Sequence, residues 1–301
     1  MVSLRNQYPI PLRGPRHDRH HRCHRPSRPH HRRGPAGPGR RPVEIRLAAR
    51  SPDRLADLAA RGFDVAAADY EQADSLEAAF AGADTVLLIS SMGVDADRLR
   101  HHRHAIEAAR RAGVQRIVYT SATHPSADSK FEWAGAHRLT EALLAESGLD
   151  WTILRDNAYA ANNAGLYEQA RGSGVLALPG VGAKVAYVTH EDVAAAAAAV
   201  LSTPGHDGRI YEITGPEAVD GHRIAALLGE VFARPVTAVD LPLADFAQGL
   251  RAAGLPEFVV TGVTSFQAAL AAGEYAAVSD DVARLTGRPA QPLRTYLETL
   301  A

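Results

Sequence analysis

Polar side chains stand directly after a series of short apolar segments in this chain. If those segments are parallel strands, their carboxyl ends share one edge of a sheet, which is where open parallel sheets bind ligands. The types present can form hydrogen bonds and ion pairs, and no regular metal-ligand spacing such as C-x-x-C accompanies them. The polar positions expected at this edge are Arg50, Asp69, Tyr70, Ser90, Ser91, Ser121, Thr123, Arg155, Asp156 and Asn157.

Arg50 and Asp69 indicate what such an edge would bind. The end of the second strand of a dinucleotide-binding sheet faces the adenosine ribose, where an acidic residue suits NAD. Arg50 suits instead the 2′-phosphate of NADP, so the sequence predicts NADPH as the cofactor. Asp69 would cap the adenine amino group. A solvated surface arginine and an ordinary turn aspartate are the alternatives.

Four hydroxyl side chains follow the next two strands along the chain. Ser90 and Ser91 would lie under the nicotinamide ribose or the phosphates, and Ser121 and Thr123 would face the nicotinamide. All four are therefore cofactor-binding candidates. Ordinary loop polarity and strand-end capping are the alternatives.

The sequence lacks the acid that is usual in carbonyl reductases with a dinucleotide-binding parallel sheet. Those enzymes place a Tyr four residues before a Lys, which lowers the tyrosine's pKa. None of the nine tyrosines has Lys at that spacing, and residues 134–141 occupy the expected place. His137 is the one good titratable candidate there, and packing or positioning of the nicotinamide is its alternative role.

Asn157 and Tyr159 follow the strand predicted at 151–154, in the segment LRDNAYAANN. This strand is the sixth when a first strand within residues 1–41 is counted. Uncharged donors of this kind could hold a carbonyl oxygen as it gains negative charge. We therefore take Asn157 and Tyr159, with His137, as catalytic candidates. Helix capping and surface amides are the alternative.

An alternation of strands and helices would position these residues. Strands are expected at 44–49, 63–68, 84–90, 116–121 and 151–154, and helices at 53–61, 75–80, 98–112 and 137–147. Such alternation is typical of right-handed βαβ units. The predicted fold is α/β, a Rossmann-like doubly wound parallel sheet over residues 42–156, with a smaller substrate-binding region over residues 157–301.

The second region has a looser pattern. Helices are expected at 157–171, 190–201, 222–232, 243–252 and 280–286, and strands at 187–189 and 210–213. Thr189 and Asp192 have the spacing of a capping box at the start of the alanine-rich helix.

Residues 1–41 do not fit this fold. The segment 17–33 reads HDRHHRCHRPSRPHHRR, where the first strand and its phosphate loop are expected. Read one nucleotide later, arginine codons at Arg22, Arg25 and Arg28 can encode glycine, and the segment is compatible with MIVITGATGHLGR. That peptide would be a buried strand running into a glycine-rich dinucleotide loop. We infer an aberrant, out-of-frame segment that rejoins the true frame near Pro42.

A genuine basic tail that binds metal or nucleic acid is the alternative for this segment. Its eleven Arg and one Asp carry +10, so the remaining residues carry −1 − 10 = −11. A mildly acidic body argues against a nucleic-acid-binding core. The single Cys and the lack of a long apolar stretch predict a soluble, cytoplasmic protein with no membrane partner. A homodimer stays open.

Four segments resemble a known family. They are VLLISS (86–91), RHAIEAARRAGVQRIVYTSA (103–122), HRLTEALLAESGLDWTILRDNAY (137–159) and YVTHEDVAAAAAAVL (187–201). They are similar to the NmrA-like atypical short-chain dehydrogenases/reductases, and most to the type 2 NAD(P)H:quinone oxidoreductases. The family's G-x-x-G-x-x-G loop is absent from the chain as written, which puts binding of the pyrophosphate in doubt.

The resemblance implies an NADPH-binding fold and hydride transfer to a quinone-like small molecule. It places His137, Asn157 and Tyr159 at the nicotinamide and acceptor side. Direct reduction of a quinone needs little general-acid help, because a hydroquinone anion is a stable product. The alternative that the resemblance leaves open is a regulatory protein that senses NADP(H) without turnover.

Overall fold

The computed structural model describes residues 45–301. The first part of the described chain alternates strands with helices, as the sequence predicts. Its elements are β1 (Arg46–Ala49), the 3₁₀ turn η1 (Pro52–Leu55), α1 (Ala56–Ala60), β2 (Asp64–Ala67), α2 (Ala73–Phe80), β3 (Thr85–Ile89), α3 (Asp95–Arg111), β4 (Arg116–Ala122), α4 (Ala134–Glu146) and β5 (Asp150–Asp156).

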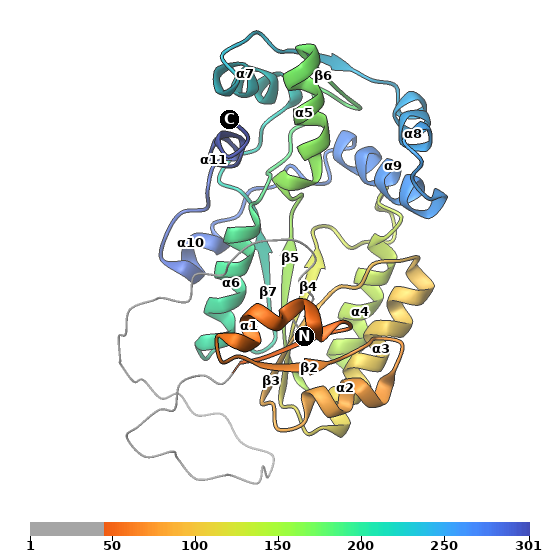
Figure 1. Cartoon of the computed structure of the whole chain (residues 1–301), viewed down its shortest axis with the longest axis vertical. Coiled ribbons are helices and arrows are strands. Elements are labelled where there is room, and N and C mark those ends of the chain that lie inside the picture. Colours follow the sequence, from red (N-terminus) through yellow and green to blue (C-terminus); the bar gives the residue numbers. More distant parts are fainter. Residues whose placement is uncertain (1–44) are drawn as a thin grey trace.

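The second part is richer in helices. Its elements are η2 (Ala160–Asn163), α5 (Ala164–Ser173), β6 (Val175–Leu178), α6 (His190–Ser202), β7 (Arg209–Ile213), α7 (Gly221–Val231), β8 (Thr237–Asp240), α8 (Leu243–Ala252), α9 (Glu257–Ala271), α10 (Asp281–Thr286) and α11 (Leu293–Glu298). In Figure 1, α5, α7, α8 and α9 lie above the strands of the main sheet.

The main sheet is parallel and has the order β3-β4-β5-β7. Helices cover both of its faces, as Figure 1 shows with α6 on one side and α3 and α4 on the other. Along β3, Val86 and Leu88 pack toward α2 and α3, whereas Leu87 packs toward α6. An apolar strand buried on both faces is typical of a doubly wound fold. The predicted α/β, Rossmann-like class with parallel sheets is confirmed.

β1 and β2 form a separate parallel pair. Within residues 45–301, β1 pairs only with β2, and β3 pairs only with β4, so each strand has one edge without a partner. In the order 3-2-1-4-5-6 of this fold, the first strand lies between these two edges. The sequence assigns that strand and its phosphate loop to residues 1–41, which lie outside the described residues.

The helices that lie above the main sheet in Figure 1, together with β6 and β8, form an upper region, and a second hydrophobic core lies within it. Tyr167, Leu176, Ile224, Leu228 and Leu297 are buried in it, and β6 pairs with β8 in a small parallel sheet. By contrast α6, β7 and α10 come from residues 157–301 but pack on the main sheet. After forming part of the upper region, the chain therefore returns to the main sheet.

Some local predictions differ from the structure. The expected strand at 187–189 is an isolated bridge between Tyr159 and Val188. The expected helix from 157 begins later, with η2 and then α5, because residues 157–159 continue in extended form beyond β5. Thr189 caps the helix as expected, since its hydroxyl accepts a bond from the Asp192 N–H. The reciprocal bond of a capping box is not formed, because the Asp192 carboxylate accepts from Arg288 and from the Gln291 N–H. Ser51 makes no such bond.

Candidate active site

The loop after β3, which carries Ser90 and Ser91, is held by a buried histidine. His102 on α3 accepts the Ser91 N–H at its Nε2 (3.0 Å), and its Nδ1 lies 2.7 Å from the Thr140 hydroxyl. Because that hydroxyl donates to the Ala136 carbonyl, Nδ1–H must be the donor to it. Burial lowers the pKa of His102 to about 3, with the Arg98 charge adding to the effect. His102 is thus a neutral side chain that holds the loop in place by hydrogen bonds.

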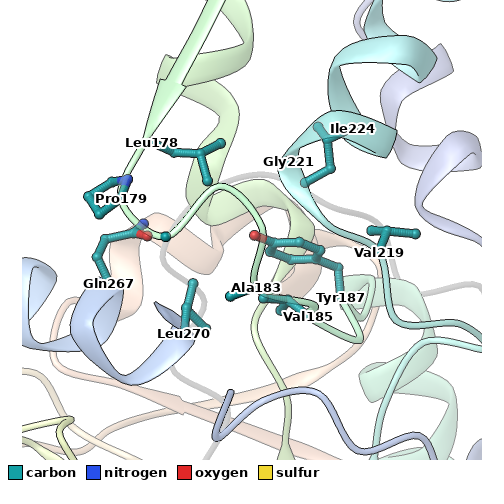
Figure 2. A pocket seen from close by; sticks show the side chains of 11 residues that line it. Leu178, Pro179, Ala183, Val185, Tyr187, Val219, Gly221, Ile224, Gln267 and Leu270 are labelled. Carbon is teal, nitrogen blue, oxygen red and sulfur yellow. The ribbon is translucent and has the colours of Figure 1, made fainter. Parts of the chain in front are cut away.

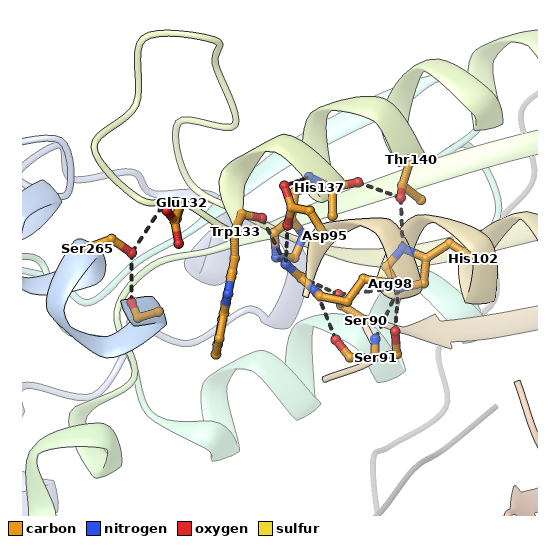
Figure 3. A network of polar contacts seen from close by, with 12 residues as sticks. Ser90, Ser91, Asp95, Arg98, His102, Glu132, Trp133, His137, Thr140 and Ser265 are labelled. Carbon is orange, nitrogen blue, oxygen red and sulfur yellow. Dashed lines mark hydrogen bonds and ion pairs between the residues drawn. The ribbon is translucent and has the colours of Figure 1, made fainter. Parts of the chain in front are cut away.

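Arg98 joins this loop to α4. Its guanidinium is only 3% exposed. It donates to the Ser91 carbonyl (2.9 Å), the Ser90 hydroxyl (2.9 Å), the Trp133 carbonyl (2.9 Å) and His137 Nε2 (2.8 Å). Figure 3 shows these side chains converging on the guanidinium. One buried cation therefore sets the relative positions of the serine loop and the start of α4.

His137 is an acceptor in this network. Its Nε2 is occupied by Arg98, so its proton sits on Nδ1 and donates to the Tyr119 hydroxyl (3.0 Å). Burial, followed by the charge of Arg98, lowers the pKa of His137 well below its ordinary value. The candidate acid is therefore a neutral imidazole without an N–H available to a substrate.

Ser121 and Thr123 lie at the end of β4 and donate to two carboxylates. Ser121 bonds Glu141 on α4 (2.7 Å), and Thr123 bonds Glu212 on β7 (3.1 Å). Arg155 pairs with both glutamates, at 2.7 Å and 3.2 Å. The structure brings these two predicted site residues together in one ion-pair network.

Asn157 and Tyr159 follow β5. Asn157 is buried, and its amide donates to the Tyr275 carbonyl (3.3 Å) while its Oδ1 accepts the Ala158 N–H (2.7 Å). The Tyr159 hydroxyl donates to Asp156 Oδ2 (2.6 Å). The strand end therefore presents a tyrosine whose proton is directed toward a carboxyl group.

Arg50 and Asp69 lie at the ends of β1 and β2. Arg50 is exposed and makes no polar contact with any residue in 45–301, so its guanidinium is open to an anion. The Asp69 carboxylate accepts the Glu71 N–H (3.0 Å), which is the turn role named as its alternative. The sequence assigns both strand ends to the adenosine half of a dinucleotide. The residues assigned to its pyrophosphate lie outside the described part of the chain.

Several residues of the network were not predicted from the sequence. Arg98 and His102 lie one helical turn apart on the buried face of α3, and Thr140, Glu141 and Glu212 complete the two clusters. A signal was available, because buried polar residues at a spacing of four on an apolar helix stripe must be hydrogen-bonded.

A cavity in the upper region, shown in Figure 2, is too small for an organic substrate. It holds about 10 Å³ and is lined by residues that include Leu178, Tyr187 and Gln267. That is room for about one water molecule. A wider groove of about 360 Å³ has Lys130 and residues of α8 and α9 among its lining.

Within residues 45–301, no three His, Cys, Asp or Glu side chains are grouped so as to hold a metal ion. The same residues include no helix that is both long and apolar enough to span a membrane.

The parallel sheet and the polar side chains at its carboxyl ends define the class of dinucleotide-binding proteins. Comparison with known proteins identifies the family. The family described as NAD(P)H-binding matches residues 39–204. Quinone oxidoreductase 2 of Escherichia coli is 36% identical over 244 residues, which are 81% of this chain and 85% of that protein. The NAD(P)H azoreductase of Xenophilus azovorans is 32% identical, over 80% of this chain and 83% of that protein.

A solved structure agrees with these relatives. The crystal structure of the NADPH-dependent quinone oxidoreductase of Escherichia coli complexed with NADPH superposes with a TM-score of 0.81. It is 35% identical and covers 86% of this chain and 90% of that chain. The chain belongs to the NAD(P)H-binding family.

Proposed function

We propose that this protein is an NADPH-dependent oxidoreductase that transfers a hydride to a quinone or related carbonyl acceptor. The observation that carries the proposal is His137. It stands where reductases of this fold keep their acid, yet it is neutral and accepts from Arg98 (2.8 Å). Such a site suits an acceptor whose reduced anion is stable. Membership of a family whose curated relatives include a quinone oxidoreductase and an azoreductase supports this choice.

The described residues assign parts of the cofactor site. Arg50 would bind the 2′-phosphate and Asp69 the adenine. Ser90 and Ser91 would lie by the nicotinamide ribose, with Ser121 and Thr123 nearer the ring. His137, Asn157 and Tyr159 would line the acceptor side, which residues 157–301 complete. NADPH supplies the hydride when bound, and the chain orients the acceptor and excludes water.

The test is steady oxidation of NADPH by a simple benzoquinone, with Arg50→Ala as the diagnostic variant. A charge-assisted bond to phosphate contributes about 1.5–3 kcal/mol, so the KM for NADPH should rise about 10- to 100-fold. The KM for NADH should change little. Arg54→Ala, an exposed arginine four residues away, is the matched control. Equal loss with both cofactors would contradict the role of Arg50. No oxidation at all by a chain whose first 41 residues are replaced by the shifted-frame peptide would contradict the function.

A second function remains for a chain that binds NADPH without turnover. The Ser121, Thr123 and Asn157 side chains already have partners within the protein, as would suit a site that holds a cofactor but does no chemistry. In that case NADPH would bind tightly while no quinone was reduced, and the protein would act as a non-catalytic NADP(H) sensor.

A further inference from the structure

The carboxyl group of Asp156 is the most unusual group at the carboxyl ends of the strands. Asp156 ends β5 and is 5% exposed. Its Oδ2 accepts the Tyr159 hydroxyl at 2.6 Å, whereas Oδ1 is buried and has no hydrogen-bond partner among the described residues. A buried carboxylate is expected to have most of its lone pairs satisfied. An acid with one proton shared toward Tyr159 fits this place better than an anion.

Among residues 45–301, no cation pairs with this carboxyl group. From β7, Glu212 adds a negative charge, and the neighbouring Arg155 is committed to Glu141 and Glu212. From α6, the ring of His190 stacks on Tyr159 with 4.4 Å between centroids. Two more carboxylates nearby have their own arginines, Asp192 of α6 paired with Arg288 and Asp281 of α10 paired with Arg284.

The electrostatics agree with the geometry. Burial raises the pKa of Asp156 from 3.8 to about 7, and Glu212 adds to the rise against the opposing bond from Tyr159. Burial also lowers the pKa of His190, so that ring is neutral beside the pair. Near neutral pH the carboxyl group therefore exchanges between its acid and its anion.

The geometry points to a two-position proton switch made by Asp156 and Tyr159, which delivers a proton to the oxygen of the reduced acceptor. With Asp156 as the acid, Oδ2–H donates to the Tyr159 oxygen, and the phenol O–H no longer has to donate to Asp156. With Asp156 as the anion, the carboxylate holds the phenol proton. This role rests on the proposed function, since it needs an acceptor that has gained a hydride. Asp156 acts through Tyr159 and is a positioning residue.

The step balances as a proton transfer. After the hydride has reduced the acceptor, the Tyr159 O–H bond breaks and a bond forms between that hydrogen and the acceptor oxygen. The Oδ2–H bond of Asp156 breaks at the same time, and its hydrogen bonds to the Tyr159 oxygen. The carboxylate left on Asp156 regains a proton from solvent, and no further oxidant or reductant is needed.

The test combines turnover with an infrared titration of the full chain. In the wild type, kcat with NADPH and benzoquinone should fall as the pH rises through about 7 and level off about tenfold lower, because ionised Asp156 withdraws the modest general-acid help of Tyr159. Asp156→Asn should flatten this dependence, and Tyr159→Phe should lower kcat about tenfold with little change in KM. Asp207→Asn, an exposed carboxylate before β7, should keep the wild-type profile.

The infrared arm does not require turnover. Between about pH 6 and 8, where ordinary carboxyl groups are ionised, the carbonyl stretch of a protonated carboxyl should disappear through about pH 7 in the wild type and be missing from Asp156→Asn. Turnover without such a band, or an unchanged pH profile in Asp156→Asn, would overturn the switch alone. A titrating band without any quinone reduction would overturn the proposed function, and with it the catalytic role of the pair.

Discussion

At the scale of single residues, burial keeps three groups of the site neutral or nearly so, namely His102, His137 and Asp156. His102 and His137 each accept one hydrogen bond at Nε2 and donate one from Nδ1, which fixes their tautomers. Asp156 is held near neutrality for the same reason, since it is 5% exposed and no cation among residues 45–301 pairs with it. The neutral histidines and Asp156 should change the unfolding free energy in opposite directions as the pH changes.

His102 should make the protein sensitive to acid. Its pKa is depressed from 6.5 to about 3, so in this range only the unfolded chain binds the proton. The stabilisation is present above pH 6.5 and is lost as the pH falls. It adds about 1.4 kcal/mol per pH unit to the slope of the unfolding free energy. His102→Asn should reduce that slope by one proton in chemical denaturation between pH 4 and 6.5.

The exposed His222 is the control for this experiment. His222→Asn should leave the slope as it is in the wild type. If His102→Asn also left the slope unchanged, His102 would be charged in the folded protein. That would contradict its acceptance of the Ser91 N–H at Nε2.

Asp156 should act in the opposite direction. Its pKa is raised from 3.8 to about 7, so its stabilising contribution is complete below 3.8 and is lost as the pH rises through 7. Asp156→Asn removes this loss. The unfolding free energy of the variant, relative to the wild type, should rise by about 1.4 kcal/mol per pH unit between pH 4 and 7. A constant difference between the two proteins would show that Asp156 ionises normally.

At the scale of elements, α9 packs against the segment before α4 through several contacts, among them Phe266 with Phe131 and Ser265 with the Glu132 N–H. Gly262 of α9 packs on the Trp133 ring, and a methyl group at this glycine would overlap that ring. Gly262→Ala should therefore destabilise the protein by about 1–3 kcal/mol through overpacking.

A second glycine in the neighbouring helix provides the comparison. Gly249 of α8 is exposed, and nothing lies within 4 Å of a methyl group placed there. Gly249→Ala should stabilise the protein by about 0.5–1 kcal/mol through helix propensity. Thermal unfolding of both variants checks the pair, and equal shifts of the same sign would refute the packing argument.

Elements with a regular pattern of apolar residues were predicted from the sequence, and elements without such a pattern were missed. The strands β2 to β5 and the helices between them were found because apolar runs alternate with amphipathic ones. α9 was missed because its sequence, EFVVTGVTSFQAALA, is rich in β-branched residues and glycine. β6 and β8 have four residues each, too few to show a period.

The candidate site was predictable in its positions and not in its partners. The edge formed by Ser90, Ser121 and Asn157 follows from strand order alone. That Arg98 reaches both Ser90 and His137 depends on the packing of α3 against α4, which no local pattern contains.

At the scale of the whole molecule, the sheet of the described residues is divided between β1 and β3. Both strands have buried residues, Leu47 and Ala48 in β1 and Val86 and Leu88 in β3, yet neither has a partner on its second edge. Unpaired strand edges in a protein interior leave backbone groups unsatisfied. We propose that the strand encoded by the shifted reading frame would fill this position.

We therefore expect a large difference between two forms of the protein. The chain as given should fold poorly or bind NADPH weakly, because no backbone amides of a glycine loop hold the pyrophosphate. A chain whose first 41 residues are replaced by the shifted-frame peptide should do both well. Thermal unfolding and titration with NADPH would measure this, and tight binding by the chain as given would contradict it. Resequencing about the first 130 nucleotides of the gene tests the frame directly.

The contact between Trp133 and α9 also makes the protein its own optical probe. The chain has two tryptophans, Trp133 and Trp151. Trp133 has the Arg98 guanidinium 5.8 Å from its ring centre and Gly262 against its edge, so its surroundings combine the serine loop, α4 and the upper region. With Trp151 replaced by Phe, fluorescence from the remaining indole would report any shift between these three parts, without a label and in the same cuvette as a cofactor titration.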